Sequence, residues 1–151
     1  TNNFNSYVPK LNERFITPLT RRITGAMLKA AINGVTPANG DSYKVLQIGK
    51  HQLAYLGVVV VVNADNTSDA MTIGYTDGTN TSATAILTSV NLNSAACTAL
   101  TGLKLFDDDG YYITVTIPDV TNLDDAMEFV LTVMVLDLSH AGITTALTAP
   151  V

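Results

Sequence analysis

The sequence contains few residues of the types that catalyse reactions or bind metal ions in proteins. Its two histidines, His51 and His140, are 89 residues apart, and its single cysteine is Cys97. A nucleophilic cysteine needs a neighbouring base, and a zinc site needs several closely spaced His or Cys ligands. Neither pattern occurs, and the small apolar residues around Cys97 are typical of a buried thiol. We expect His51 to lie on the surface.

Acidic residues form two clusters that could supply oxygen ligands for a calcium ion, at 107–109 and at 124–125. Calcium loops alternate their acidic ligands, whereas the three aspartates of the first cluster are contiguous and their side chains point in different directions. We interpret 107–109 as a solvated turn, and 124–125 as a turn cap or a contact for a basic segment. Because nucleophile-elbow, phosphate-loop and zinc-protease motifs are also absent, we predict no enzyme, no catalytic residue, no cofactor and no metal site.

The charge of the chain is low and unevenly distributed. Charged residues make up 14% of the sequence, against about 25% in an average domain. The net charge of −5 combines +5 in residues 1–50 with −10 in residues 51–151. A basic segment before an acidic body can contact nucleic acid or an acidic neighbour. The basic residues are dispersed and have no aromatic platform, so we expect no nucleic-acid partner.

The first part of the chain differs in texture from the rest. Residues 1–42 lack the alternation of a strand, and we expect an extended arm through about residue 20 and a short helix near 25–32. Four residues of this segment are predicted to contact a partner: Arg14, Phe15, Arg21 and Arg22. Residues 43–138 are expected to form one domain, and residues 139–151 a flexible tail.

Residues 43–138 have the pattern of an antiparallel β-sandwich. Short apolar or alternating segments are separated by turns such as Asp77-Gly78, whereas residues 94–103 are ambiguous between a helix and an irregular connection. The predicted fold is therefore mostly β. The predicted strands are 43–49, 51–62, 71–76, 84–92, 111–117 and 127–138.

Two of these strands are apolar on both faces. In 51–62 one face is Leu53, Tyr55, Gly57, Val59 and Val61, and the other is Ala54, Leu56, Val58, Val60 and Val62. In 127–136 one face is Met127, Phe129, Leu131, Val133 and Val135, and the other is also mostly apolar. A sheet with only one packed face should be polar on its outer face. The second faces must therefore be covered, either by residues 1–42 of the same chain or by a neighbouring subunit.

No membrane or export segment is expected. Residues 1–20 contain no apolar run of the kind found in signal peptides, and no stretch reaches the roughly 18 apolar residues of a membrane span. We expect a soluble protein that is made in the cytoplasm and has no membrane partner.

The order of these segments resembles the capsid decoration proteins of tailed phages, also called cement or head-stabilising proteins. The resemblance is carried by the unit Val45-Leu46-Gln47-Ile48-Gly49, an apolar strand at 53–64, the segment Met71-Thr72-Ile73-Gly74-Tyr75-Thr76-Asp77, and the closing strands at 111–115 and 129–135. It covers about residues 43–138. It implies a jelly-roll-like sandwich, often a homotrimer, that binds the major capsid protein on the virion surface.

On this resemblance the basic N-terminal segment would pair with acids of the capsid, and deleting residues 1–20 would abolish capsid binding. The alternative function is a receptor- or glycan-binding module of a phage head or tail fibre. In that case Tyr111 or Tyr112 would stack on the sugar.

Overall fold

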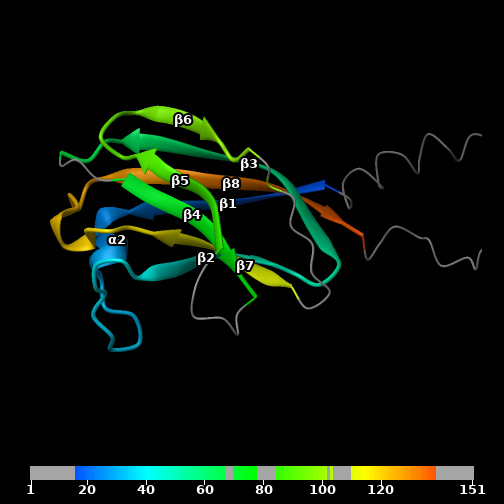
Figure 1. The fold of residues 1–151 in the computed structure, drawn as a ribbon, viewed down its shortest axis with the longest axis horizontal. Coiled ribbons are helices and arrows are strands. Elements are labelled where there is room, and N and C mark those ends of the chain that lie inside the picture. Colours follow the sequence, from blue (N-terminus) through cyan, green and yellow to red (C-terminus); the bar gives the residue numbers. More distant parts are fainter. Residues whose placement is uncertain (1–15, 67–69, 78–83, 102, 104–109, 139–151) are drawn as a thin grey trace, which may run out of the picture.

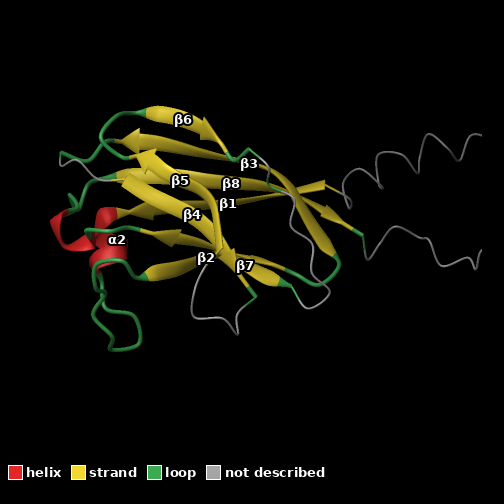
Figure 2. Cartoon of the chain, in the orientation of Figure 1, coloured by secondary structure: helices red, strands yellow, loops and turns green. Residues whose placement is uncertain are grey.

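The chain folds into two layers of strands with one short helix at one end (Figures 1 and 2). A computed structural model describes residues 16–66, 70–77, 84–101, 103 and 110–138. The helix α2 spans Gly25–Lys29, and a 3-10 turn, η1, spans Val120–Asn122. The strands are β1 Ile16–Thr24, β2 Ser42–Ile48, β3 Gln52–Asn63, β4 Ala70–Thr76, β5 Thr84–Asn91, β6 Ala96–Ala99, β7 Tyr111–Thr116 and β8 Glu128–Asp137.

The strands form two four-stranded sheets with the order of a jelly roll. One sheet has the order β1-β8-β3-β6 and the other β2-β7-β4-β5, and the paired strands are antiparallel. Every connection except β4 to β5 crosses from one sheet to the other, which is how a jelly roll interleaves its two sheets. The predicted antiparallel jelly-roll-like sandwich is confirmed.

The core lies between the two sheets and is built by alternation along the strands. In β8 every second residue points inward, and Phe129, Leu131 and Val133 are fully buried. The opposing sheet contributes Ile73 and Ile113, which are also inaccessible to solvent. The strands predicted at 111–117 and 127–138 are confirmed, and both run through the middle of their sheets.

A bulge in β3 makes the predicted faces of that strand partly wrong. Its register against β8 shifts between Ala54 and Leu56, so Tyr55 is an extra residue without an opposite partner. Ala54 therefore points into the core, whereas Tyr55 and Leu56 are both exposed. Leu53 lies opposite the half-buried Leu136 and also faces outward. Strict alternation would have placed Leu53 and Tyr55 on the inner face.

The expected arm is a strand in its last part. β1 pairs with β8 along its whole length, from Ile16 opposite Leu136 to Thr24 opposite Glu128. The sandwich therefore includes residues ahead of position 43, where we had expected it to begin. The pattern hides the strand because β1 is at the edge of its sheet and only Ile23 is buried. Residues 1–15 and the predicted tail at 139–151 lie outside the described residues.

Two predictions near residue 97 were also wrong. The ambiguous segment contains strand β6, which pairs with β3, so it is neither a helix nor wholly irregular. Cys97 is exposed rather than buried. The physical reason is again an edge position: β6 is the last strand of its sheet, and Cys97 lies opposite Val60, a residue of the outer face.

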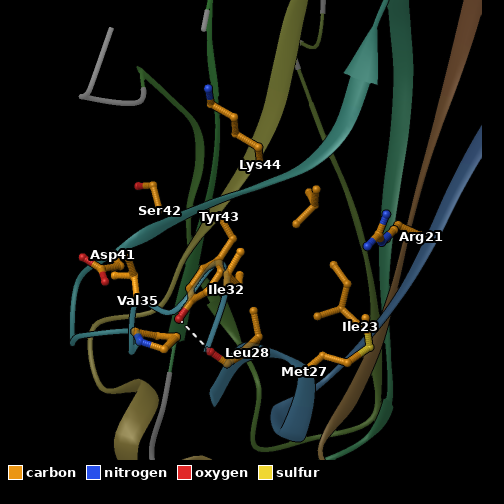
Figure 3. Close-up of a pocket in the computed structure, with 12 residues that line it drawn as sticks. Arg21, Ile23, Met27, Leu28, Ile32, Val35, Asp41, Ser42, Tyr43 and Lys44 are labelled. Atoms are coloured by element: carbon orange, nitrogen blue, oxygen red, sulfur yellow. Dashed lines mark hydrogen bonds between the residues drawn. The ribbon is translucent and has the colours of Figure 1, made fainter. Parts of the chain in front are cut away.

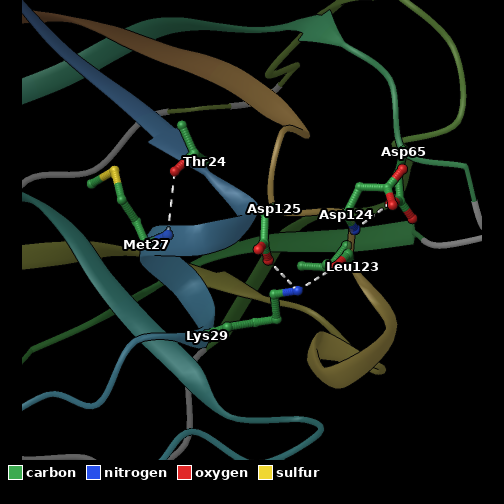
Figure 4. A network of polar contacts seen from close by, with 7 residues as sticks. All are labelled: Thr24, Met27, Lys29, Asp65, Leu123, Asp124 and Asp125. Carbon is green, nitrogen blue, oxygen red and sulfur yellow. Dashed lines mark hydrogen bonds and ion pairs between the residues drawn. The ribbon is translucent and has the colours of Figure 1, made fainter.

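The helix α2 is fixed to the segment before β8, as Figure 4 shows. Thr24 caps it by accepting a hydrogen bond from the Met27 amide at 3.2 Å. The Gly25 amide donates to the Met127 carbonyl at 2.8 Å, and a Cβ at Gly25 would lie 1.9 Å from the Asp124 carbonyl oxygen. Only glycine fits this approach, and the predicted short helix is confirmed over Gly25–Lys29.

Lys29 joins α2 to the acidic pair that the sequence singled out. Its ammonium group donates to the Leu123 carbonyl at 2.7 Å and forms an ion pair with Asp125. The neighbouring Asp124 accepts from the Asn66 amide through its carboxylate. The pair at 124–125 therefore contacts a basic residue of the same chain.

Replacing Lys29 by methionine is expected to lower the free energy of unfolding by about 1–2 kcal/mol, because a partly buried carbonyl loses a charged donor. Replacing Asp125, whose side chain is 74% exposed, by asparagine should cost less than about 1 kcal/mol. Urea denaturation of the two variants measures both values. Equal losses would mean that the ion pair, and not the bond to Leu123, holds the helix.

Candidate docking surfaces

The outer face of the β1-β8-β3-β6 sheet is apolar over most of its area. Directly opposite residues of antiparallel strands share a face, so the strand registers define its members. Leu56 and Val62 are 56% and 50% exposed there. We call this surface the apolar sheet face; its apolar members are Ile16, Pro18, Leu53, Tyr55, Leu56, Val58, Val60, Val62, Cys97, Ala99, Val130, Met134 and Leu136. Four polar residues, Thr20, Arg22, Glu128 and Thr132, lie on the same face.

The outer face of the other sheet is polar along its two central strands. Thr72 of β4 and Thr116 of β7 are directly opposite each other there, and Thr116 hydrogen-bonds to Ser42 of β2. The Lys44 ammonium lies 4.7 Å from the ring centre of Tyr112 on the same side. A polar outer face is what a solvated sheet shows. The sandwich thus has one face suited to water and one suited to a partner.

None of the described elements packs on the apolar sheet face. β1 extends the same sheet sideways instead of covering it, and α2 contacts β1 and η1 at one end of the sandwich (Figure 1). Residues 16–42 therefore do not provide the cover that the sequence left open. Three strands about 4.8 Å apart that overlap over about 30 Å, with the four-residue β6 beside them, give roughly 500 Å² in projection. A standard protein interface buries about 800 Å² per partner, which is the same order.

Of the four residues predicted to contact a partner, the structure describes Arg21 and Arg22, which point to different sides of β1. Arg22 is on the apolar sheet face, opposite Val130, and its guanidinium forms an ion pair with Glu128. Arg21 is the next residue of an extended strand and points to the other side, where it borders a groove. Arg14 and Phe15 lie outside the described residues. The Arg22–Glu128 pair means that part of the basic segment neutralises the acidic body of its own chain.

A groove of about 530 Å³ lies on the open side of the sandwich, between the edges formed by β1 and β2 (Figure 3). Arg21, Asp41, Tyr43 and Lys44 supply its polar groups. The Tyr43 hydroxyl crosses it and donates to the Leu28 carbonyl at 2.9 Å. Its apolar lining consists of Ile23, Met27, Leu28, Ile32, Val35, Pro37 and Val45.

A tight turn forms one lip of the groove, and the sequence analysis missed it. Ile32 and Val35 exchange two backbone hydrogen bonds of 3.0 and 2.9 Å, with Asn33 and Gly34 between them at φ 51° and 79°. Positive φ at both central positions is the requirement of a type I′ hairpin turn, and Asn-Gly is its strongest sequence signal. The turn holds Ile32 and Val35 at 52% and 68% exposure. With the exposed Met27 they line one groove, and apolar side chains exposed together are more typical of interaction sites than single ones are.

Burial, and secondarily the nearby Asp41 carboxylate, raises the pKa of Tyr43 above its ordinary value of 10. Below pH 10 the phenol is protonated in the folded and unfolded states, and its stabilising contribution is complete. Above pH 10 the unfolded chain loses the proton first, so the free energy of unfolding should fall until the pH passes the raised pKa.

The measurement is urea denaturation of wild type and Tyr43→Phe at several pH values above 9. The difference in stability between them should shrink as the pH rises. A difference that does not change with pH would contradict the raised pKa.

The residues that could do other chemistry are engaged or dispersed. Tyr111 is buried, receives a hydrogen bond from the Ala54 amide at 3.4 Å, and packs edge-on against Tyr75. It cannot stack on a sugar, which removes one of the two residues of the glycan-binding alternative. His51 is exposed, as predicted. Within the described ranges no group of three or more His, Cys, Asp or Glu side chains is suited to a metal ion, and 107–109 lie outside them.

No helix within the described residues is long and apolar enough to cross a bilayer.

Comparison with solved structures gives a likeness in fold. No protein-family model matches the chain, and no curated protein matches it. A chain of the "Acidic stable capsid structure of Helicobacter pylori bacteriophage KHP30" aligns with a TM-score of 0.57 and 14% identity, over 81% of this chain and 87% of that chain. The two chains share a fold. Because the alignment spans most of both, the likeness extends over the sandwich as a whole.

Proposed function

We propose that this chain is a structural protein of a bacteriophage capsid and docks on the shell through the apolar sheet face. In this role it decorates the virion surface, binds the major capsid protein and catalyses no reaction. The observation that carries the proposal is the contrast between the two outer faces, one apolar and uncovered by the described residues, the other polar. The fold shared with a chain of a phage capsid structure supports the same class of function.

The contrast fits a protein that lies flat on a larger surface. Burying a Val or Leu side chain contributes about 1.5–3 kcal/mol, so covering the exposed side chains of β3 alone supplies a large part of an interface. The thiol of Cys97 and the Arg22–Glu128 pair lie on the same face and would be covered with it. The polar groups of β4 and β7 would then face solvent.

The direct test is co-sedimentation with undecorated capsids of the phage that encodes the chain. We expect saturable binding at a fixed ratio to the major capsid protein, and decorated capsids that withstand a higher temperature before they break. Absence of binding, with reproducible binding to a glycan array instead, would overturn the proposal and favour the receptor-binding alternative.

To test whether the N-terminal segment contributes to capsid binding, the deletion must be shorter than residues 1–20, which the sequence suggested. Removing residues 1–20 would also remove five residues of β1 and unsettle the sheet. Deleting residues 1–15 tests the segment with β1 intact. Reduced capsid affinity would support a role for Arg14 and Phe15, and unchanged affinity would restrict binding to the sheet face.

A further inference from the structure

The groove between β1 and β2 has the features of a site for an extended apolar segment. Met27, Ile32 and Val35 line it with 45%, 52% and 68% of their surface exposed, and they account for three of the eight large hydrophobic side chains that are exposed in the described structure. β1 and β2 are edge strands, each with one side that carries no strand partner within the described ranges. Free strand edges beside apolar pockets are how proteins bind extended peptides.

We propose that this groove binds residues 139–151 of a second copy of the chain, so that copies join end to end. This segment follows β8 directly, contains no Lys, Arg, Asp or Glu, and carries Ile143 and Leu147 as aliphatic anchors. Residues 1–15 suit the groove less well, because they carry Lys10 and Arg14 against the single acid Glu13. Arg21 and Lys44 at the groove would repel them more than Asp41 attracts them.

The direction of the chain favours a second copy over the segment's own groove. β8 ends at the opposite end of the sandwich from α2 and the groove (Figure 1), and the Leu138 amide is held there by the His51 carbonyl at 2.9 Å. Arg21, at the near end of the groove, lies opposite Leu131. Seven residues of strand from Leu131 to Leu138 span about 23 Å.

The reach of the two anchors favours a second copy. Ile143 is five residues beyond Leu138 and can extend at most about 18 Å from it, whereas Leu147 is nine residues beyond and can extend about 32 Å. In its own groove only Leu147 would be within reach, so the two anchors can be seated together only in the groove of a copy that faces the end of β8. Such a contact joins two different surfaces, so it is heterologous and produces a ring when the rotation closes. The inference concerns self-association and does not require the proposed capsid role.

The test uses two full-length variants, each altered at one side of the contact. Val35→Glu places a charge in the groove at an exposed position, and Leu147→Glu places one in the segment. We expect the dissociation constant of self-association, measured by sedimentation equilibrium, to be at least tenfold higher for each variant alone than for wild type. Mixed in equal amounts, they should recover one productive contact per pair and form a species of twice the monomer mass.

Two outcomes of this experiment overturn the proposal. One is a wild-type protein that stays monomeric at its highest soluble concentration, and the other is a pair of variants that assemble as wild type does. If Leu11→Glu dissociates the assembly and Leu147→Glu does not, residues 1–15 are the occupant and the proposal is also wrong. Val60→Asp serves as the control, because the apolar sheet face is not part of this contact and the assembly should persist.

A cross-linking experiment separates a second copy from the segment's own chain. In a Cys97→Ser background, Val35→Cys and Leu147→Cys are combined in one protein and oxidised. Disulfides between copies give a ladder of covalent oligomers on a denaturing gel, as we expect. A single monomer band that contains the disulfide would show self-docking and overturn the proposal.

Discussion

Replacing Val60 by aspartate is expected to weaken capsid binding by at least about 30-fold while the sandwich stays folded. Val60 is in the middle of the apolar sheet face, between Val130 of β8 and Cys97 of β6. A charge buried there without a partner costs more than about 2 kcal/mol of binding energy, as central interface positions typically do. The free protein tolerates the charge because this side chain is only half-buried. Co-sedimentation with undecorated capsids measures the loss.

The matched control is Thr72→Asp on the outer face of the other sheet. Thr72 is also half-buried on a central strand. Its replacement by aspartate therefore removes a similar amount of strand propensity and adds the same charge as Val60→Asp does. We expect its capsid affinity to equal that of wild type. Loss of binding by Thr72→Asp, or normal binding by Val60→Asp, would place the docking surface elsewhere.

Replacing Phe129 by alanine is expected to lower the free energy of unfolding by about 3–5 kcal/mol. Phe129 is fully buried on β8, the strand that pairs with both β1 and β3, and it lies opposite Ile23 and Val61. Truncating it removes apolar burial and leaves a cavity that the flanking strands cannot close. Urea denaturation gives the value directly, provided the m-value is unchanged.

Val130→Ala is the control for this measurement, because Val130 is the next residue of the same strand and points outward. Its loss of stability should be below about 1 kcal/mol. Because Val130 lies on the apolar sheet face, its truncation should weaken capsid binding instead. Equal destabilisation by the two variants would mean that something in the free protein already covers the outer face.

The central strands could be predicted from the sequence because their burial alternates without interruption. Residues 111–117 and 127–135 show the pattern directly, and the structure has strands there with buried alternate residues. The bulge at Tyr55 could not be predicted, since every residue around it is apolar and any register satisfies the pattern. The edge strands β1 and β6 were missed for a related reason. An edge strand with one buried residue or none carries little alternation.

The candidate surfaces could be predicted only in part. The two-sided apolar character of β3 and β8 indicated that a second face of the sheet needs a cover. The sequence could not show that β1 pairs at the edge of this sheet, so that residues 16–42 do not cover the face. The groove depends on contacts between segments far apart in the sequence, such as Tyr43 with Leu28. One local signal was available and overlooked: Asn33-Gly34, which forms the turn at the lip of the groove.

The most direct test of the capsid role is a cryo-electron microscopy map of particles that carry this protein. The account predicts that Val60 and Val130 lie within about 4 Å of capsid protein atoms, while Thr72 and Thr116 face solvent. It would be contradicted by the opposite orientation, with the apolar sheet face open to solvent.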